Sequence, residues 1–144
     1  MVLYKERVTP NLGTFAAVSV LLPSTVIISE PFDLLVGLVV GLIGVLGIWA
    51  LLFFRAPQIW VTKEKLYVGR ASIPRDLIGE PVAISKSEVF GERGPKLDPA
   101  AYKVFQGSIK TAIKIPISDP QDPTPYWLVS TRNPAKLAIV LKSS

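Results

Sequence analysis

The sequence predicts a membrane α-helical hairpin followed by a small antiparallel β-barrel or sheet domain that ends in a helix. Residues 34–54 form one apolar run without a charge or a proline, and residues 9–29 form a second, less regular one. After Arg55 the long apolar runs give way to short alternating runs separated by proline and glycine. The first pattern is typical of transmembrane helices and the second of β-strands.

The run from 34 to 54 is the stronger of the two predicted spans. As a helix that rises about 1.5 Å per residue it is about 31 Å long, which matches the roughly 30 Å hydrocarbon core of a bilayer. Gly37, Gly41 and Gly44 recur on one face and form a predicted helix-packing interface, because glycine lets another backbone approach closely. Either the first span packs on this face or a helix of another protein does.

The first span, residues 9–29, contains Pro23, which removes one backbone hydrogen bond and predicts a kink. The span ends before a short external turn at residues 30–33, in which Asp33 is placed to cap the second helix. A signal peptide is the alternative, since a basic segment precedes the apolar one. No small-x-small cleavage site lies near the end of the span and a longer span follows at once, so we favour the hairpin.

Basic residues are expected to set the orientation of the hairpin. They lie before the first span and after the second, and the turn between the spans has none. By the positive-inside rule, residues 1–8 form a cytoplasmic N-terminus and residues 55–144 a cytoplasmic β domain, in a multi-pass protein of the plasma membrane. Four basic residues are candidate contacts for anionic lipid headgroups, with ordinary charge flanking as the alternative: Arg55, Lys63, Lys65 and Arg70.

The β domain is predicted from alternation and from turn residues. Its clearest strand is residues 109–117, where isoleucine and threonine alternate with other residues, so that one face is buried. A last strand is expected at residues 126–131. Residues 133–142 are predicted to form the C-terminal helix, because an Asn-Pro pair suits a helix start and the apolar residues that follow share one face.

The composition excludes several kinds of chemistry. Histidine and cysteine are both absent, which removes thiol nucleophiles, imidazole bases, zinc and iron–sulfur sites and disulfides. The densest carboxylate group is Asp119 and Asp122, in a segment stiffened by proline, where each is more simply a turn former than a metal ligand. We therefore expect no catalytic residue, no metal site and no cofactor.

One stretch next to this segment is a candidate partner surface. Tyr126, Trp127 and Arg132 are of residue types enriched at binding hot spots. The proline-rich run before them would lower the ordering cost of an interface. A core strand that simply buries the two aromatic side chains is an equal alternative.

Two resemblances add to these predictions. Residues 59–69, with residues 73–74 and 77–78 after them, resemble the opening of bacterial pleckstrin-homology-like domains, which often follow a pair of membrane helices and end in a helix. Residues 97–102 and 119–132 are similar to the signature segments of an actinobacterial membrane-protein family catalogued as domain of unknown function 3093. This second resemblance covers nearly the whole chain and implies an actinobacterial origin and a two-pass anchor, but no known reaction.

These observations favour a non-catalytic role over an enzyme. We expect an accessory subunit or scaffold whose hairpin docks to the subunits of a larger integral membrane complex, with respiratory and envelope assemblies as candidate hosts. The alternative is a membrane-anchored module that binds anionic lipid headgroups through a basic face. We expect no nucleic-acid partner.

Overall fold

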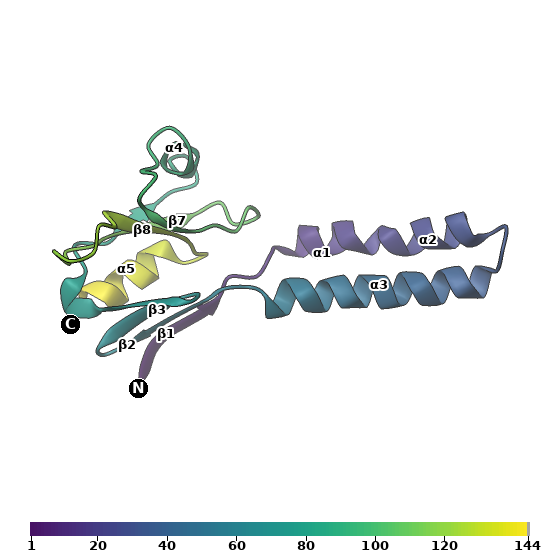
Figure 1. The fold of residues 1–144 in the computed structure, drawn as a ribbon, viewed down its shortest axis with the longest axis horizontal. Coiled ribbons are helices and arrows are strands. Elements are labelled where there is room, and N and C mark those ends of the chain that lie inside the picture. Colours follow the sequence, from purple (N-terminus) through teal and green to yellow (C-terminus); the bar gives the residue numbers. More distant parts are fainter. Residues whose placement is uncertain (144) are drawn as a thin grey trace. The chain divides into compact units, whose positions relative to one another are not determined.

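The structure is a computed structural model that describes residues 1–143 (Figure 1). It divides into two compact units. One is the hairpin of residues 9–56, and the other is a β unit made of residues 1–8 and the chain from Pro57 onward. The β unit therefore starts before the hairpin, whereas the sequence predicted it only after Arg55.

The hairpin contains three helices: α1 (Leu12–Ser19), α2 (Leu21–Ser29) and α3 (Leu34–Phe54). The stretches Leu12–Ser29 and Leu34–Phe54 are long and apolar enough to cross a membrane, with mean hydropathies of 1.9 and 2.7. The bounds predicted for the second span are those of α3. The first stretch is interrupted at Val20, so it forms two helices rather than one.

The interruption at Val20 follows from Pro23, which has no backbone N–H to donate to the carbonyl of Ser19 one turn earlier. The predicted kink is thus confirmed as a break. Side chains cap the starts of α1 and α3. Asn11 Oδ1 accepts from the backbone N–H of Thr14 at 3.0 Å, and Asp33 caps α3 as predicted. The first helix begins at Leu12, later than residue 9, because Asn11 provides the cap.

The glycines of α3 divide into two groups. A Cβ atom on Gly37 would lie 2.7 Å from Cβ of Ser29 and 2.9 Å from the backbone carbonyl oxygen of Thr25, and one on Gly41 would also meet Thr25. α2 therefore packs directly on these two glycines. A Cβ atom on Gly44 would meet nothing within 4 Å, so the third residue of the predicted interface takes no part in the hairpin's own packing.

Trp49 connects α3 to α1 at the end of the hairpin that lies away from its turn. Its indole Nε1–H donates to the backbone carbonyl oxygen of Phe15 at 3.2 Å. The two rings meet edge to face, with centroids 5.8 Å apart. α1 is thereby tied to α3 by an aromatic and polar contact, while α2 is tied to it by close backbone packing.

The β unit contains two four-stranded sheets. The first is antiparallel throughout, in the order β1-β2-β3-β4, and the second has the order β5-β7-β8-β6 with β6 parallel to β8. The strands of the first sheet are β1 (Val2–Arg7), β2 (Gln58–Thr62), β3 (Lys65–Val68) and β4 (Ala71–Pro74). Those of the second are β5 (Val82–Ile84), β6 (Tyr102–Val104), β7 (Ala112–Pro116) and β8 (Tyr126–Ser130).

Two short helices and one longer helix complete the unit: the 3₁₀ helix η1 (Arg75–Leu77), α4 (Val89–Arg93) and α5 (Pro134–Lys142). α5 lies between the two sheets (Figure 1), and the predicted C-terminal helix is confirmed. It buries Leu137, Ala138 and Leu141 in a core shared with the inward side chains of both sheets. A smaller core lies on the other face of the second sheet, beneath α4.

The structure differs from the sequence prediction in strand number and direction. β1 was not predicted, because residues 1–8 carry charge and precede an apolar span. The strand expected at residues 109–117 is shorter, and β6 makes the second sheet mixed rather than antiparallel. In place of one antiparallel barrel or sheet, the described residues form two sheets that enclose a helix.

The hairpin is inserted between two strands that are paired with each other. β1 and β2 are antiparallel neighbours, with Arg7 opposite Gln58. At the end of this pair the backbone N–H of Val8 donates to the carbonyl oxygen of Pro57 at 2.8 Å. The chain therefore leaves the sheet and returns to it at one point, which we call the exit end of the first sheet.

The hairpin packing gives a first prediction. Gly37→Ala should lower the stability of the hairpin by about 1–3 kcal/mol, since the new methyl group meets the backbone of α2. Gly44→Ala should not lower it, because no atom lies in its way. Thermal unfolding in detergent micelles, followed by circular dichroism, measures both variants, and equal effects would contradict this packing.

Candidate interaction surfaces

The first sheet has one covered face and one open face. Residues alternate along its strands, so that Tyr4, Ile59, Leu66 and Ile73 lie in the core and their neighbours in sequence point the other way. We call this second set the outward face. It includes Val2, Lys5, Arg7, Gln58, Trp60, Thr62, Lys65, Tyr67, Ser72 and Pro74.

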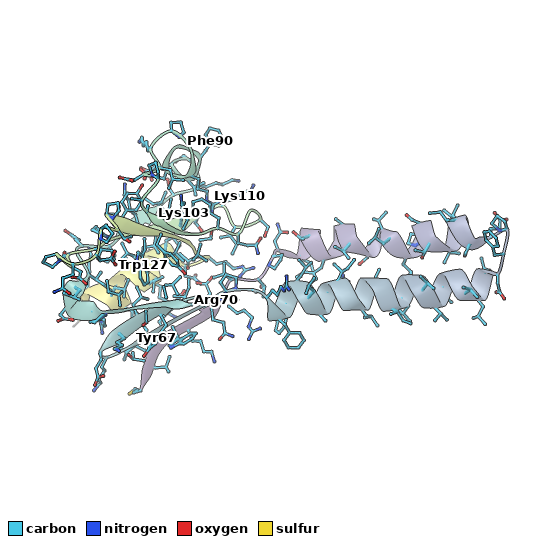
Figure 2. All side chains as sticks on the ribbon, in the orientation of Figure 1. Tyr67, Arg70, Phe90, Lys103, Lys110 and Trp127 are labelled. Atoms are coloured by element: carbon cyan, nitrogen blue, oxygen red, sulfur yellow. The ribbon has the colours of Figure 1, made fainter. Side chains whose placement is uncertain are left out.

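An aromatic pair lies at the centre of the outward face. The rings of Trp60 and Tyr67 stack with centroids 4.9 Å apart and an angle of 16° between their planes. Strand pairing places Lys5 opposite Trp60 and Ser72 opposite Tyr67, so the four residues form one row across the sheet. Figure 2 labels Tyr67 on this side of the sheet. Beside the indole is a shallow hollow of about 230 Å³, which Val2, Lys5, Gln58 and Trp60 line.

The charge on the outward face has one sign. Lys5, Arg7 and Lys65 are basic, and none of the outward positions is acidic. Glu6, the single acidic residue in these four strands, points to the covered face. The outward face thus combines basic groups with two large aromatic side chains, a combination typical of surfaces that meet anionic groups at an apolar boundary.

The four predicted lipid contacts do not form one patch. Lys63 and Lys65 lie at the β2–β3 turn, at the far end of the first sheet. Arg70 lies at the exit end, in the β3–β4 turn beside Gly69, whose positive φ of 61° suits the tight turn. Arg55 belongs to the hairpin unit. Of the four, only Lys65 points out from a strand of the outward face, and the sequence missed Lys5, Trp60 and Tyr67 because their strand pairing was not visible.

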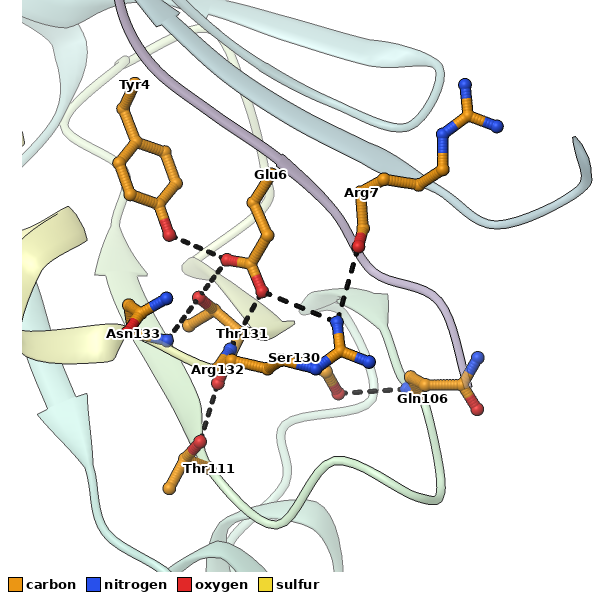
Figure 3. A network of polar contacts seen from close by, with 9 residues as sticks. All are labelled: Tyr4, Glu6, Arg7, Gln106, Thr111, Ser130, Thr131, Arg132 and Asn133. Carbon is orange, nitrogen blue, oxygen red and sulfur yellow. Dashed lines mark hydrogen bonds and ion pairs between the residues drawn. The ribbon is translucent and has the colours of Figure 1, made fainter. Parts of the chain in front are cut away.

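A polar network fixes β1 to the end of β8, and we call it the clasp (Figure 3). One carboxylate oxygen of Glu6 accepts from the hydroxyls of Tyr4 at 2.7 Å and Thr131 at 2.5 Å. The other accepts from the backbone N–H of Arg132 at 2.9 Å, and the Arg132 guanidinium lies 4.0 Å away. The same guanidinium donates to the carbonyl oxygen of Arg7. Residues at opposite ends of the chain are thereby joined around one carboxylate.

The clasp is largely removed from water. Thr131 is fully buried, and the side chain of Glu6 is only 10% exposed. A buried carboxylate needs such partners, because an unpaired one would be strongly destabilising. Burial, together with the hydrogen bond to Glu6, raises the pKa of Tyr4 to about 12. The Glu6 carboxylate accepts hydrogen bonds from Tyr4, Thr131 and the backbone of Arg132, so the clasp fastens β1 to the end of β8.

The predicted partner surface around residue 126 is mostly core. Tyr126 and Trp127 are 9% and 5% exposed, on opposite faces of β8. Trp127 packs against Tyr102 between the sheets, and the Tyr126 hydroxyl accepts from the backbone N–H of Asp98 at 2.8 Å. In this structure the two aromatic residues are core residues rather than a surface for a partner. Arg132, which is partly exposed, belongs to the clasp.

The second sheet has its own polar fastenings. Arg93 of α4 donates to Ser130 Oγ at 2.7 Å and to the carbonyl oxygen of Ile109 at 3.0 Å. Its partial burial lowers the pKa of its guanidinium. Lys114 pairs with Glu92 at 3.1 Å and lies over the ring of Tyr126. These contacts hold α4 on the second sheet.

A larger hollow of about 760 Å³ lies between the β2–β3 turn, the loop after η1 and the end of α5. Arg75 lines this hollow. Its guanidinium donates to the backbone carbonyl oxygens of Val140, Leu141 and Ser143 at the C-terminal end of α5. Lys142 and Glu80 form an ion pair of 2.7 Å at its rim. Arg75 thus caps the C-terminal end of α5, and Lys142 of the same helix is paired with Glu80.

The aspartates of the proline-rich segment form turns. Asp119 accepts from the backbone N–H of Gln121 at 2.9 Å, and Asp122 from that of Thr124 at 2.8 Å. The hydrogen bonds to Thr124 lower the pKa of Asp122. This agrees with the turn-forming role expected for these residues. Within residues 1–143, no three acidic side chains gather as a metal site would require.

The fold and these surfaces define a class of protein: an apolar helical hairpin inserted into a two-sheet β unit. Residues 3–141 match the sequence model of a family described as protein of unknown function (DUF3093). The match spans almost the whole chain, so the protein belongs to this family. No curated protein and no solved structure matches the chain.

The clasp gives a second prediction. Tyr4→Phe should lower the free energy of unfolding by about 1–2 kcal/mol near neutral pH, because it removes one donor from buried Glu6. The pKa of Tyr4 is higher in the folded protein, about 12 against 10.0, so its contribution is present below pH 10 and is lost as the pH rises to 12. Denaturant unfolding across this range should show the difference from the wild type shrinking.

Tyr67→Phe is the matched control, because it removes a tyrosine hydroxyl from the outward face rather than from the clasp. Tyr67→Phe should change the free energy of unfolding little, both near neutral pH and at pH 12. An effect of Tyr67→Phe equal to that of Tyr4→Phe would show that the clasp does not hold β1.

Proposed function

We propose that the protein is a non-catalytic accessory subunit or scaffold of a larger integral membrane complex, anchored by its hairpin. The proposal takes the two apolar stretches as transmembrane helices, with both termini and the β unit on the cytoplasmic side. Respiratory and envelope assemblies are candidate hosts. The likeness to pleckstrin-homology-like domains and the actinobacterial origin stay predictions.

The observation that carries the proposal is the unoccupied part of the α3 surface. α2 uses Gly37 and Gly41, but Cβ atoms on Gly44 and Gly47 would meet nothing within 4 Å. Large apolar side chains of the same helix, such as Ile43 and Leu46, are 67% and 53% exposed. Small residues beside larger ones on a membrane helix permit close approach of a further helix.

The link between hairpin and β unit supports a scaffold. The chain enters and leaves the hairpin through β1 and β2, which pair with each other, and the clasp fixes β1 to the end of β8. A partner that holds α3 would therefore hold the β unit by two short connections rather than one. Such an arrangement suits a subunit that keeps a cytoplasmic domain at a fixed place on a complex.

The test is native sizing after mild detergent extraction of the source membranes. The wild-type chain should migrate with a larger assembly, and Gly44→Leu/Gly47→Leu should migrate free, because the added side chains fill the surface a partner helix needs. Ile43→Leu, a change without added bulk on the same helix, should behave as the wild type. The hairpin itself should stay folded in all three, since neither glycine contacts α2.

Migration of the wild-type chain as a free monomer under these conditions would reject the proposal. Equal association of the double-leucine variant and the wild type would reject the α3 surface as the contact.

A further inference from the structure

We infer that the outward face of the first sheet rests on the anionic lipid surface of the bilayer that holds the hairpin. The inference requires the membrane insertion proposed above, but it does not require a partner complex. It assigns a ligand class, the anionic phospholipid headgroup, to a surface on which the sequence placed only Lys65.

The charged residues of the first sheet are divided between its two faces by the sign of their charge. Alternation sends Glu6 to the covered face and Lys5, Arg7 and Lys65 to the outward face. Every charged outward position is therefore basic, although the sheet as a whole also contains an acidic residue. Basic groups near an anionic leaflet are attracted to it, and acidic groups among them would weaken that attraction.

Two aromatic side chains lie among these basic groups. Trp60 and Tyr67 stack on each other at the centre of the outward face, where only part of each side chain is covered. Tryptophan and tyrosine favour the headgroup level of a bilayer, because their rings are apolar with one polar group. Lys5 and Trp60 both line the hollow, so a basic residue and an aromatic residue border the same space. A headgroup phosphate and the start of an acyl chain would meet matching groups there.

The two connections between the first sheet and the hairpin are short. Residues 9–11 join Val8, at the exit end of the first sheet, to α1, and residues 55–57 join α3 to β2. Three residues span at most about 10–14 Å between their neighbours when extended. If the hairpin crosses a bilayer, the first sheet cannot leave the neighbourhood of the lipid surface. Even weak contacts become populated at such an effective concentration.

Other occupants fit less well. A second copy or a partner protein would have to offer an acidic surface, and nothing in the outward face selects one. The bilayer, in contrast, is brought close by the chain itself and carries anionic charge. Anionic lipid is therefore the occupant that fits the outward face, and the experiment below distinguishes it from a second copy of the chain.

The test uses the absence of cysteine from the chain. Ser72→Cys places a nitroxide label on the outward face, next to Tyr67. Ser87→Cys places the same label on the exposed loop before α4. α4 covers the face of the second sheet that points away from the main core, so this label lies far from the outward face. The full chain is inserted into nanodiscs of neutral phosphatidylcholine or of phosphatidylcholine with one third phosphatidylglycerol, and collision of each label with a water-soluble nickel reagent is measured.

The expected result is shielding of the Ser72 label in anionic discs but not in neutral ones, with the Ser87 label open in both. About 1 M salt should remove the shielding, since it screens charges beyond roughly 3 Å. Lys5→Gln/Lys65→Gln should also remove it, because each basic group near an anionic surface strengthens binding about fivefold. Lys103→Gln/Lys110→Gln, which makes the same change of charge at exposed positions elsewhere, should not.

Four outcomes overturn the inference. The Ser72 label could be equally open in both lipids, or equally shielded in both. Its shielding could grow with the number of chains per disc and ignore lipid charge, which identifies a second copy as the occupant. Failure of the chain to enter discs would remove membrane insertion as well. Migration as a free monomer in native sizing, in contrast, would reject the accessory subunit and leave this inference standing.

Discussion

The pairing of β1 with β2 is the constraint on which the rest of the structure depends. A hairpin of 48 residues, 9–56, is inserted between these two strands, yet Val8 and Pro57 are joined by a backbone hydrogen bond. Closing such a long loop is entropically unfavourable unless something holds its ends. The two helical stretches pack against each other inside the loop, and the sheet pairs its ends. Each unit therefore lowers the entropic cost of forming the other.

The clasp matters because β1 is an edge strand. One side of β1 pairs with β2, and an edge strand by itself is held by a single ladder. Glu6 adds a second attachment on the covered face, through Thr131 and the backbone of Arg132. The buried carboxylate is stabilised only while these donors are in place. The N-terminal strand, which leads straight into the hairpin, is thus fixed to the C-terminal half of the β unit.

The sequence predicted the parts that depend on local pattern. The bounds of α3, the cap at Asp33 and the break caused by Pro23 each follow from a few neighbouring residues. β1 could not be predicted in the same way, because half of it is charged and its partner strand β2 begins only after the hairpin, at Gln58. Parallel pairing of β6 with β8 depends equally on long-range contacts. Glu6 gave no sign of its role, since only the fold brings Thr131 to it.

The candidate surface illustrates the same limit at the level of side chains. By residue type, Tyr126 and Trp127 predict a partner surface as well as Trp60 and Tyr67 do, and both pairs lie on strands. The two aromatic pairs differ in how many faces of their strands are covered by other parts of the β unit. β8 is covered on both faces, by the main core and by the core beneath α4, so both of its aromatic residues are buried. β2 and β3 are covered on one face only, so alternation leaves Trp60 and Tyr67 outward.

That difference also explains the sorting of charge. A strand covered on both faces has little room for an unpaired charge, and Lys114 of β7 is accordingly paired with Glu92. A strand with one open face can place every basic residue outward at no such penalty, as Lys5 and Lys65 show. The outward face is therefore a consequence of the sheet arrangement, and its concentration of basic and aromatic groups needs no burial to maintain it. Residues that are not required to hold the fold together remain available for contact with another surface.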